Sequence, residues 1–181
     1  LFRSPIAWLH EICPVDQNWC LVHATHAEPD ELRSIVESDA TVGLCPTTEA
    51  NLGDGVFPAA EFLQSGGYFG IGSDSQVCTA PSEELKLLEY AQRLSLQRRT
   101  VLVKDDEGSV GRSLVELALS GGNRALGEGT WGLVPGAHRR LMLAGPRDRA
   151  CARRRLPSRA APRAACPRRL RRRRKEERRQ T

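Results

Sequence analysis

Three short apolar runs, each preceded or followed by a segment with helical periodicity, constrain the fold of this chain most. The runs are too short for helices and are predicted as strands at residues 19–22, 40–45 and 68–73. Helices are predicted at residues 5–12, 30–38, 57–64, 83–96 and 110–119. A strand recurs on the order of every 25 residues, which is typical of right-handed βα units on a parallel sheet. The pattern therefore predicts an α/β fold.

Two parallel architectures satisfy this alternation: a doubly wound sheet and a (β/α)8 barrel. A complete barrel needs about 250 residues, whereas the patterned part of the chain ends near residue 138. The body could therefore hold only part of a barrel. Because the chain starts at Leu1 rather than Met, with a predicted helix almost at once, we expect a piece of a longer protein.

Charge divides the 181 residues into two parts. Residues 139–181 hold 18 of the 27 Lys and Arg but only 3 of the 22 Asp and Glu, so a body of net charge −10, residues 1–138, precedes a tail of net charge +15. The tail is rich in Arg, Ala and Pro and lacks periodicity. We expect it to be disordered or translated out of frame.

Composition also bears on location and on metal binding by cysteine. No apolar run approaches the roughly 18 residues of a membrane span, and no stretch has the pattern of a secretory signal. We therefore expect a soluble, cytoplasmic protein with no membrane partner. The six cysteines are too scattered to form a CxxC pair.

Polar side chains follow each predicted strand, at the edge where parallel α/β folds hold their working residues. His23 follows the first strand, residues 46–55 form a predicted loop after the second, and Asp74 follows the third. An imidazole and a carboxylate at strand ends suit a metal-assisted hydrolase. By spacing alone, a histidine such as His23 after an apolar strand is more often a packing residue. The loop fits pocket lining and a surface loop in which Asn51 and Asp54 make turn hydrogen bonds equally well.

Four strings resemble the formimidoylglutamate deiminases of the amidohydrolase superfamily, in order and in spacing. They are LVHATH at 21–26, GLCPTTEANLGDG at 43–55, GIGSDS at 70–75 and EELKLLEYAQRL at 83–94. The resemblance covers roughly residues 5–136, and CPTTEANLGDG is its most specific element. It implies a metal-dependent (β/α)8 barrel of which this chain supplies strands six, seven and eight, followed by the start of the return into a small β-sandwich domain. With only these strands, both sheet edges are expected to be open.

The resemblance also implies a reaction. In that family a divalent metal, usually zinc, activates a water that attacks the formimino carbon of N-formimino-L-glutamate. Ammonia leaves and N-formyl-L-glutamate remains, a step of histidine degradation.

The resemblance assigns roles to individual residues. Asp74 falls on the strand-eight aspartate that binds the metal and takes a proton from its water. His23 falls on the strand-six histidine that stabilises the attacking hydroxide and the tetrahedral intermediate. Glu49 and Asn51 are candidate substrate-pocket residues. After the SDS triplet, Gln76 stands where the family more often has histidine.

The family's other functional residues precede the part that this chain matches. They are the His-x-His pair of strand one, the metal-binding histidine of strand five and the glutamate three residues after it. We therefore expect the chain to be inactive alone.

Other functions remain open at this stage. Half a barrel does not exclude another aminohydrolase of the same superfamily, acting on purines, pterins or triazines, and only the string at residues 46–55 separates the two. The basic run at residues 168–179 could instead bind nucleic acid through phosphates, without sequence specificity because it has no aromatic residue for base stacking. For the deiminase we expect a small-molecule substrate and no specific nucleic acid, with a homodimer as one option for the parent enzyme.

Overall fold

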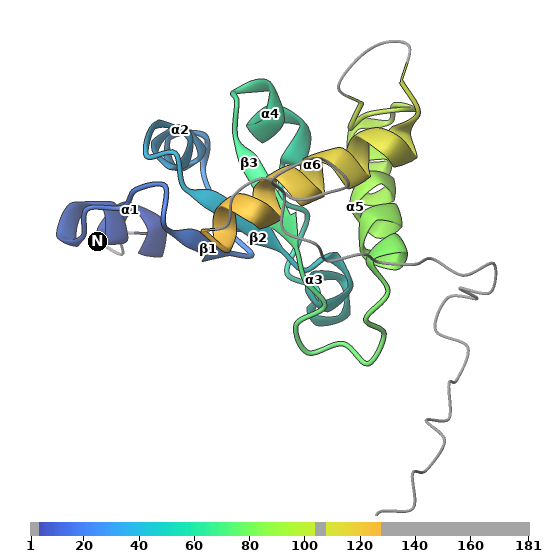
Figure 1. The fold of residues 1–181 in the computed structure, drawn as a ribbon, viewed down its shortest axis with the longest axis horizontal. Coiled ribbons are helices and arrows are strands. Elements are labelled where there is room, and N and C mark those ends of the chain that lie inside the picture. Colours follow the sequence, from blue (N-terminus) through green and yellow to red (C-terminus); the bar gives the residue numbers. More distant parts are fainter. Residues whose placement is uncertain (1–3, 104–107, 128–181) are drawn as a thin grey trace, which may run out of the picture. The chain divides into compact units, whose positions relative to one another are not determined.

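The computed structural model describes residues 4–103 and 108–127, which contain a parallel sheet and helices packed against it (Figure 1). The strands are β1 (Cys20–Val22), β2 (Thr41–Leu44) and β3 (Tyr68–Ile71). The helices are α1 (Pro5–Ile12), α2 (Pro29–Glu37), α3 (Pro46–Leu52), α4 (Ala59–Gln64), α5 (Pro81–Leu96) and α6 (Val110–Ala125).

The sheet has the order β1-β2-β3, and both neighbouring pairs are parallel. Leu21 pairs with Val42, and Val42 pairs in turn with Phe69. The predicted parallel α/β arrangement is confirmed, with each strand inside its predicted run. Strand residues such as Val42 and Phe69 form one core with Ile35 of α2 and Phe62 of α4, all of them at most 1% exposed.

The segment after β2 differs from the prediction, because the first seven residues of the loop expected at residues 46–55 form the helix α3. Pro46 occupies the start of the helix, where its fixed φ suits helical backbone and its missing N–H leaves no bond unmade. Gly53, with φ of +72°, ends it in the left-handed region. A helix of seven residues is too short to show an apolar repeat, which is why periodicity missed it.

The last helix also differs from its prediction. We expected it to stop at the pair Gly121-Gly122, but α6 continues to Ala125. Gly121 allows close packing instead of ending the helix, because a Cβ built on it would overlap the backbone of Phe69. A Cβ on Gly70 of β3 would in turn come within 3.3 Å of the Gly122 backbone.

Helix α6 runs across β3 and β2 (Figure 1) and packs mainly against β3, an outer strand of the sheet. The Gly72 N–H donates to the Leu44 carbonyl of β2 at 2.9 Å. Backbone groups of successive strand residues point to alternate sides, so those of Phe69 point away from β2 and toward Gly121. Within the described residues β1 and β3 have one strand neighbour each, and α6 lies against the Phe69 backbone on the other side of β3.

Arg124 fixes the far end of α6. Its Nη2 lies 2.6 Å from Asp39 Oδ1, in the turn before β2, and its guanidinium carbon lies 4.0 Å from the centre of the Tyr68 ring at the start of β3. One side chain therefore links α6 to the amino ends of two strands.

Within residues 4–103 and 108–127, no helix has both the length and the apolar character needed to cross a bilayer. The expectations for the tail at residues 139–181, and for the end of the body near residue 138, fall outside the described residues.

Candidate functional site

The three segments that sequence patterns marked for chemistry meet at one edge of the sheet. His23 directly follows β1, α3 begins two residues after β2 ends, and Asp74 lies three residues beyond β3. The strands are parallel neighbours, so their carboxyl ends lie side by side. The His23 N–H donates to the Gly43 carbonyl of β2 at 2.8 Å, which continues the strand pairing into the site.

His23 and Asp74 share an unusual backbone conformation. Their φ angles are +69° and +46°, in the left-handed region that residues with a Cβ rarely adopt. Such conformations cost on the order of 1–3 kcal/mol and cluster at functional sites. No sequence pattern predicts these left-handed conformations. Here they occur at both residues to which the resemblance gives a catalytic role.

Glu49 of α3 faces His23. Its Oε1 lies 3.2 Å from His23 Nδ1 and also accepts the Cys45 N–H at 2.8 Å. The Glu49 side chain is only 6% exposed, whereas that of His23 is 33% exposed. The predicted pocket residue Glu49 is thus turned inward onto the imidazole, a pairing across 26 residues that no local pattern could reveal.

Thr48 holds the turn that carries Asp74, and sequence reasoning missed it. Its Oγ1 donates to the Ser73 carbonyl at 3.0 Å and lies 3.4 Å from Ser75 Oγ. Thr48 is 1% exposed, and Asp74 between the two serines is exposed. The Asp74 carboxylate is therefore exposed to solvent on a turn that the buried Thr48 holds in place.

Thr47 ties the same helix to α5. Its N–H donates to Glu84 Oε2 at 2.9 Å, and its Oγ1 donates to Glu84 Oε1. The consecutive residues Thr47, Thr48 and Glu49 therefore hold three different elements around the carboxyl edge. This division of contacts gives a structural reason for the distinctive TTE part of the string.

Cys45 is the buried thiol at this edge. Burial, reinforced by the negative charges of Glu49, Asp74 and Glu84, raises the pKa of Cys45 to about 11. Its Sγ lies against Gly72, where an added Cβ would come within 3.6 Å. A thiol with this pKa stays neutral near pH 7, and a neutral thiol is neither a good nucleophile nor a good metal ligand.

The other residues that the sequence analysis singled out either lie away from His23 and Asp74 or make only backbone contacts near them. Asn51 is exposed on α3, and no contact brings it to His23 or Asp74 among the described interactions. Gln76 closes the turn after β3 by donating its N–H to the Ser73 carbonyl at 3.0 Å. His26, to which the resemblance gives no role, is exposed.

The described part of the chain supplies one residue suited to bind a metal at this edge. Asp74 offers carboxylate oxygens, a donor type that zinc accepts. Within the described ranges no three His, Cys, Asp or Glu side chains come together as a metal would require. A single carboxylate does not hold zinc, so further ligands would have to come from other residues.

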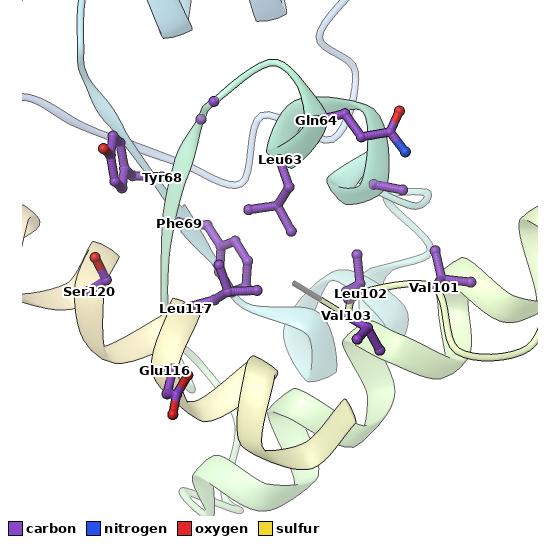
Figure 2. Close-up of a pocket in the computed structure, with 13 residues that line it drawn as sticks. Leu63, Gln64, Tyr68, Phe69, Val101, Leu102, Val103, Glu116, Leu117 and Ser120 are labelled. Atoms are coloured by element: carbon purple, nitrogen blue, oxygen red, sulfur yellow. The ribbon is translucent and has the colours of Figure 1, made fainter. Parts of the chain in front are cut away.

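The described residues line two cavities of note, one far from His23 and Asp74 and one beside Glu49. A cavity of about 420 Å³ is lined by α4, α6, residues 101–103 and the first residues of β3, where Leu63, Phe69 and Leu102 converge (Figure 2). It lies at the opposite end of β3 from Asp74. A second cavity, of about 300 Å³, lies between α3 and α5, with Glu49 in its wall.

Comparison with known proteins agrees with this geometry. Residues 2–128 match the model of the Amidohydrolase family. The chain is 51% identical over 141 residues to formimidoylglutamate deiminase from Pseudomonas aeruginosa, covering 78% of this chain and 31% of the relative. It is 27% identical to a 5-methylthioadenosine/S-adenosylhomocysteine deaminase from Natronomonas pharaonis, over 68% of this chain and 28% of the relative.

Solved structures give the same result for the fold. An amidohydrolase from Brucella melitensis is 49% identical with a TM-score of 0.71, over 75% of this chain and 30% of that one. An adenosine deaminase from Xanthomonas campestris with bound zinc, 23% identical, shares the fold with a TM-score of 0.61, over 69% of this chain and 28% of that one. The chain thus spans less than a third of the length of each of these proteins.

Proposed function

We propose that this chain, which belongs to the amidohydrolase family, supplies barrel strands six to eight and the catalytic edge of a deiminase acting on N-formimino-L-glutamate. The observation that carries the proposal is the 51% identity over 141 residues to a formimidoylglutamate deiminase. The convergence of His23, α3 and Asp74 at one sheet edge supports it independently.

The proposed reaction is hydrolysis of an amidine. Water adds to the formimino carbon, and the resulting tetrahedral intermediate expels the terminal nitrogen as ammonia. A carbonyl replaces the C=N bond, so the products are N-formyl-L-glutamate and ammonia. A proton must leave the attacking water and another must reach the departing nitrogen.

Asp74 and His23 would divide this work. A divalent metal, zinc in the proposal, would supply Lewis acidity that makes water a nucleophile near neutral pH. Asp74 would be one of its ligands and would accept the proton of the attacking water. His23, with Nδ1 engaged by Glu49, would accept a hydrogen bond at Nε2 from the hydroxyl of the attacking water and keep that bond in the tetrahedral intermediate, which stabilises both. Asn51 stays a predicted pocket residue.

The wider features of the enzyme are proposals from the same family likeness. The barrel strand numbers, the zinc ion, the cytoplasmic location, the small-molecule substrate and a homodimer of the parent enzyme all belong to them. Nucleic-acid binding by residues 168–179 stays a separate prediction, which a salt titration of the tail peptide would measure.

A chimera tests the proposal. The matched 141 residues of the Pseudomonas aeruginosa relative are replaced by the corresponding residues of this chain, so that all other barrel strands are present. Ammonia release is then measured with N-formimino-L-glutamate and with 5′-methylthioadenosine. We expect turnover of the first substrate, and preference for the nucleoside would favour the purine-type alternative. The same chimera with Asp74→Ala is the inactive control.

A further inference from the structure

The geometry points to Glu49 as the positioning residue of His23, holding the Nδ1–H of the imidazole so that Nε2 is left for the reacting atoms. This inference rests on the proposed role of His23. It gives Glu49 a task different from that of a substrate contact.

The hydrogen-bond pattern determines which ring nitrogen of His23 carries the hydrogen. Glu49 Oε1 accepts the Cys45 N–H at 2.8 Å and lies 3.2 Å from His23 Nδ1. A carboxylate oxygen can only accept from these two groups, so Nδ1 carries the hydrogen. In a neutral imidazole the other nitrogen, Nε2, is then the free acceptor. Glu49 therefore selects the tautomer of His23.

The two side chains differ in their burial and in how firmly their backbone is held. His23 sits in a left-handed turn with a third of its side chain exposed, so packing alone does not fix its ring. Glu49 is 5% exposed, on a helix anchored through Thr48 to the β3 turn and through Thr47 to Glu84. The buried, anchored carboxylate is thus suited to orient the partly exposed imidazole.

Burial also argues against a direct substrate contact. The Glu49 oxygen that faces the site is already shared between two protein donors, and its side chain is 6% exposed. Binding substrate through this oxygen, Oε1, would mean giving up one of these two bonds. A substrate contact predicts a raised KM on mutation, whereas a positioning residue predicts a lowered kcat.

The tautomer is measured first, by NMR of the full 181-residue chain with ¹⁵N-labelled histidine, the His23 signal being assigned with His23→Ala. We expect the Nδ1–H form. Glu49→Ala should shift His23 toward the Nε2–H form, whereas Glu49→Gln should keep the original form because its amide oxygen can accept both bonds. Glu49→Asp keeps the charge but shortens the reach, and should behave like Glu49→Ala.

Glu89→Ala is the matched control. Glu89 is another buried carboxylate, 2% exposed, which accepts the N–H groups of Val101 and Leu102 away from His23. It should destabilise the chain without changing the His23 tautomer. An unchanged His23 tautomer in Glu49→Ala would overturn the inference.

Kinetics of the chimera give the second readout. Glu49→Ala should lower kcat by about 10–100-fold, the usual effect of losing the partner that orients a site histidine, with KM and metal content unchanged. Glu49→Gln and Glu89→Ala should stay within a few-fold of the parent. A raised KM with unchanged kcat would make Glu49 a substrate contact and overturn the inference. If the chimera without point substitutions does not hydrolyse N-formimino-L-glutamate, the proposed function is refuted. The inference about Glu49 is then still tested by the tautomer of His23, which does not depend on the substrate.

Discussion

Gly121 of α6 lies directly against the backbone of Phe69 in β3, so closely that any Cβ at position 121 would overlap the Phe69 carbonyl. This contact places α6 along the side of β3 that does not pair with β2. It also explains the glycine at position 121 in the last turns of a helix, where glycine is otherwise unfavourable.

The contact predicts opposite outcomes for two neighbouring substitutions. Gly121→Ala should lower the free energy of unfolding by about 1–3 kcal/mol, the usual effect of overpacking. Gly122→Ala meets nothing within 4 Å, so the better helix propensity of alanine should leave stability unchanged or raise it by up to about 1 kcal/mol. Urea unfolding of the full chain measures both. Equal losses in the two variants would mean that α6 does not pack on β3 in this way.

Arg124 predicts a second difference in stability. Arg124→Met should lower the free energy of unfolding by about 1–2 kcal/mol, because it removes the ion pair with Asp39 and the cation–π contact with Tyr68. Arg112→Met removes the exposed pair with Glu116 on the same helix and should have no measurable effect. Thermal melts of both variants make the comparison, and similar melting temperatures would argue against the link between α6 and the amino ends of the strands.

Cys45 predicts a pH dependence at the alkaline end. Its pKa is about 11 in the folded chain against an ordinary value of 9.0, so the unfolded chain loses this proton first as the pH rises. The stability from the protonated thiol is complete below pH 9 and is lost progressively between about pH 9 and 11. Denaturant midpoints across this range should fall less steeply for Cys45→Ala than for the parent. Parallel pH profiles would contradict the raised pKa.

The catalytic assignment predicts separable effects in the chimera. Asp74→Ala should abolish turnover and reduce the bound metal, because it removes a proposed ligand. His23→Ala should keep the metal and slow turnover by about 10²–10⁴-fold, as expected for the loss of acid–base or oxyanion help. Elemental analysis beside steady-state rates tests both. Loss of metal in His23→Ala with retention in Asp74→Ala would reverse the two roles.

The sequence predicted what local patterns encode. Apolar runs located the three strands, and the polar residues after them, His23 and Asp74, could be placed at one edge because parallel strands end together. The partners of these residues could not be predicted. Thr48 contacts a turn 25 residues away and Glu49 a histidine 26 residues away, so only the folded chain brings these groups together.

Two local features escaped prediction for other physical reasons. Helix α3 is too short for periodicity, although Pro46 and Gly53 stand at its two ends. The pair Gly121-Gly122 has the composition of a helix stop, and only the Phe69 backbone beside Gly121 shows that the missing side chain at position 121 allows close packing.

The most direct test of the central claim is ammonia release from N-formimino-L-glutamate by the zinc-loaded chimera. We expect a rate comparable with that of the Pseudomonas aeruginosa relative, and none from the 181-residue chain alone, whose described residues offer Asp74 without a cluster of further ligands. A folded, metal-loaded chimera that released no ammonia from this substrate would contradict the account.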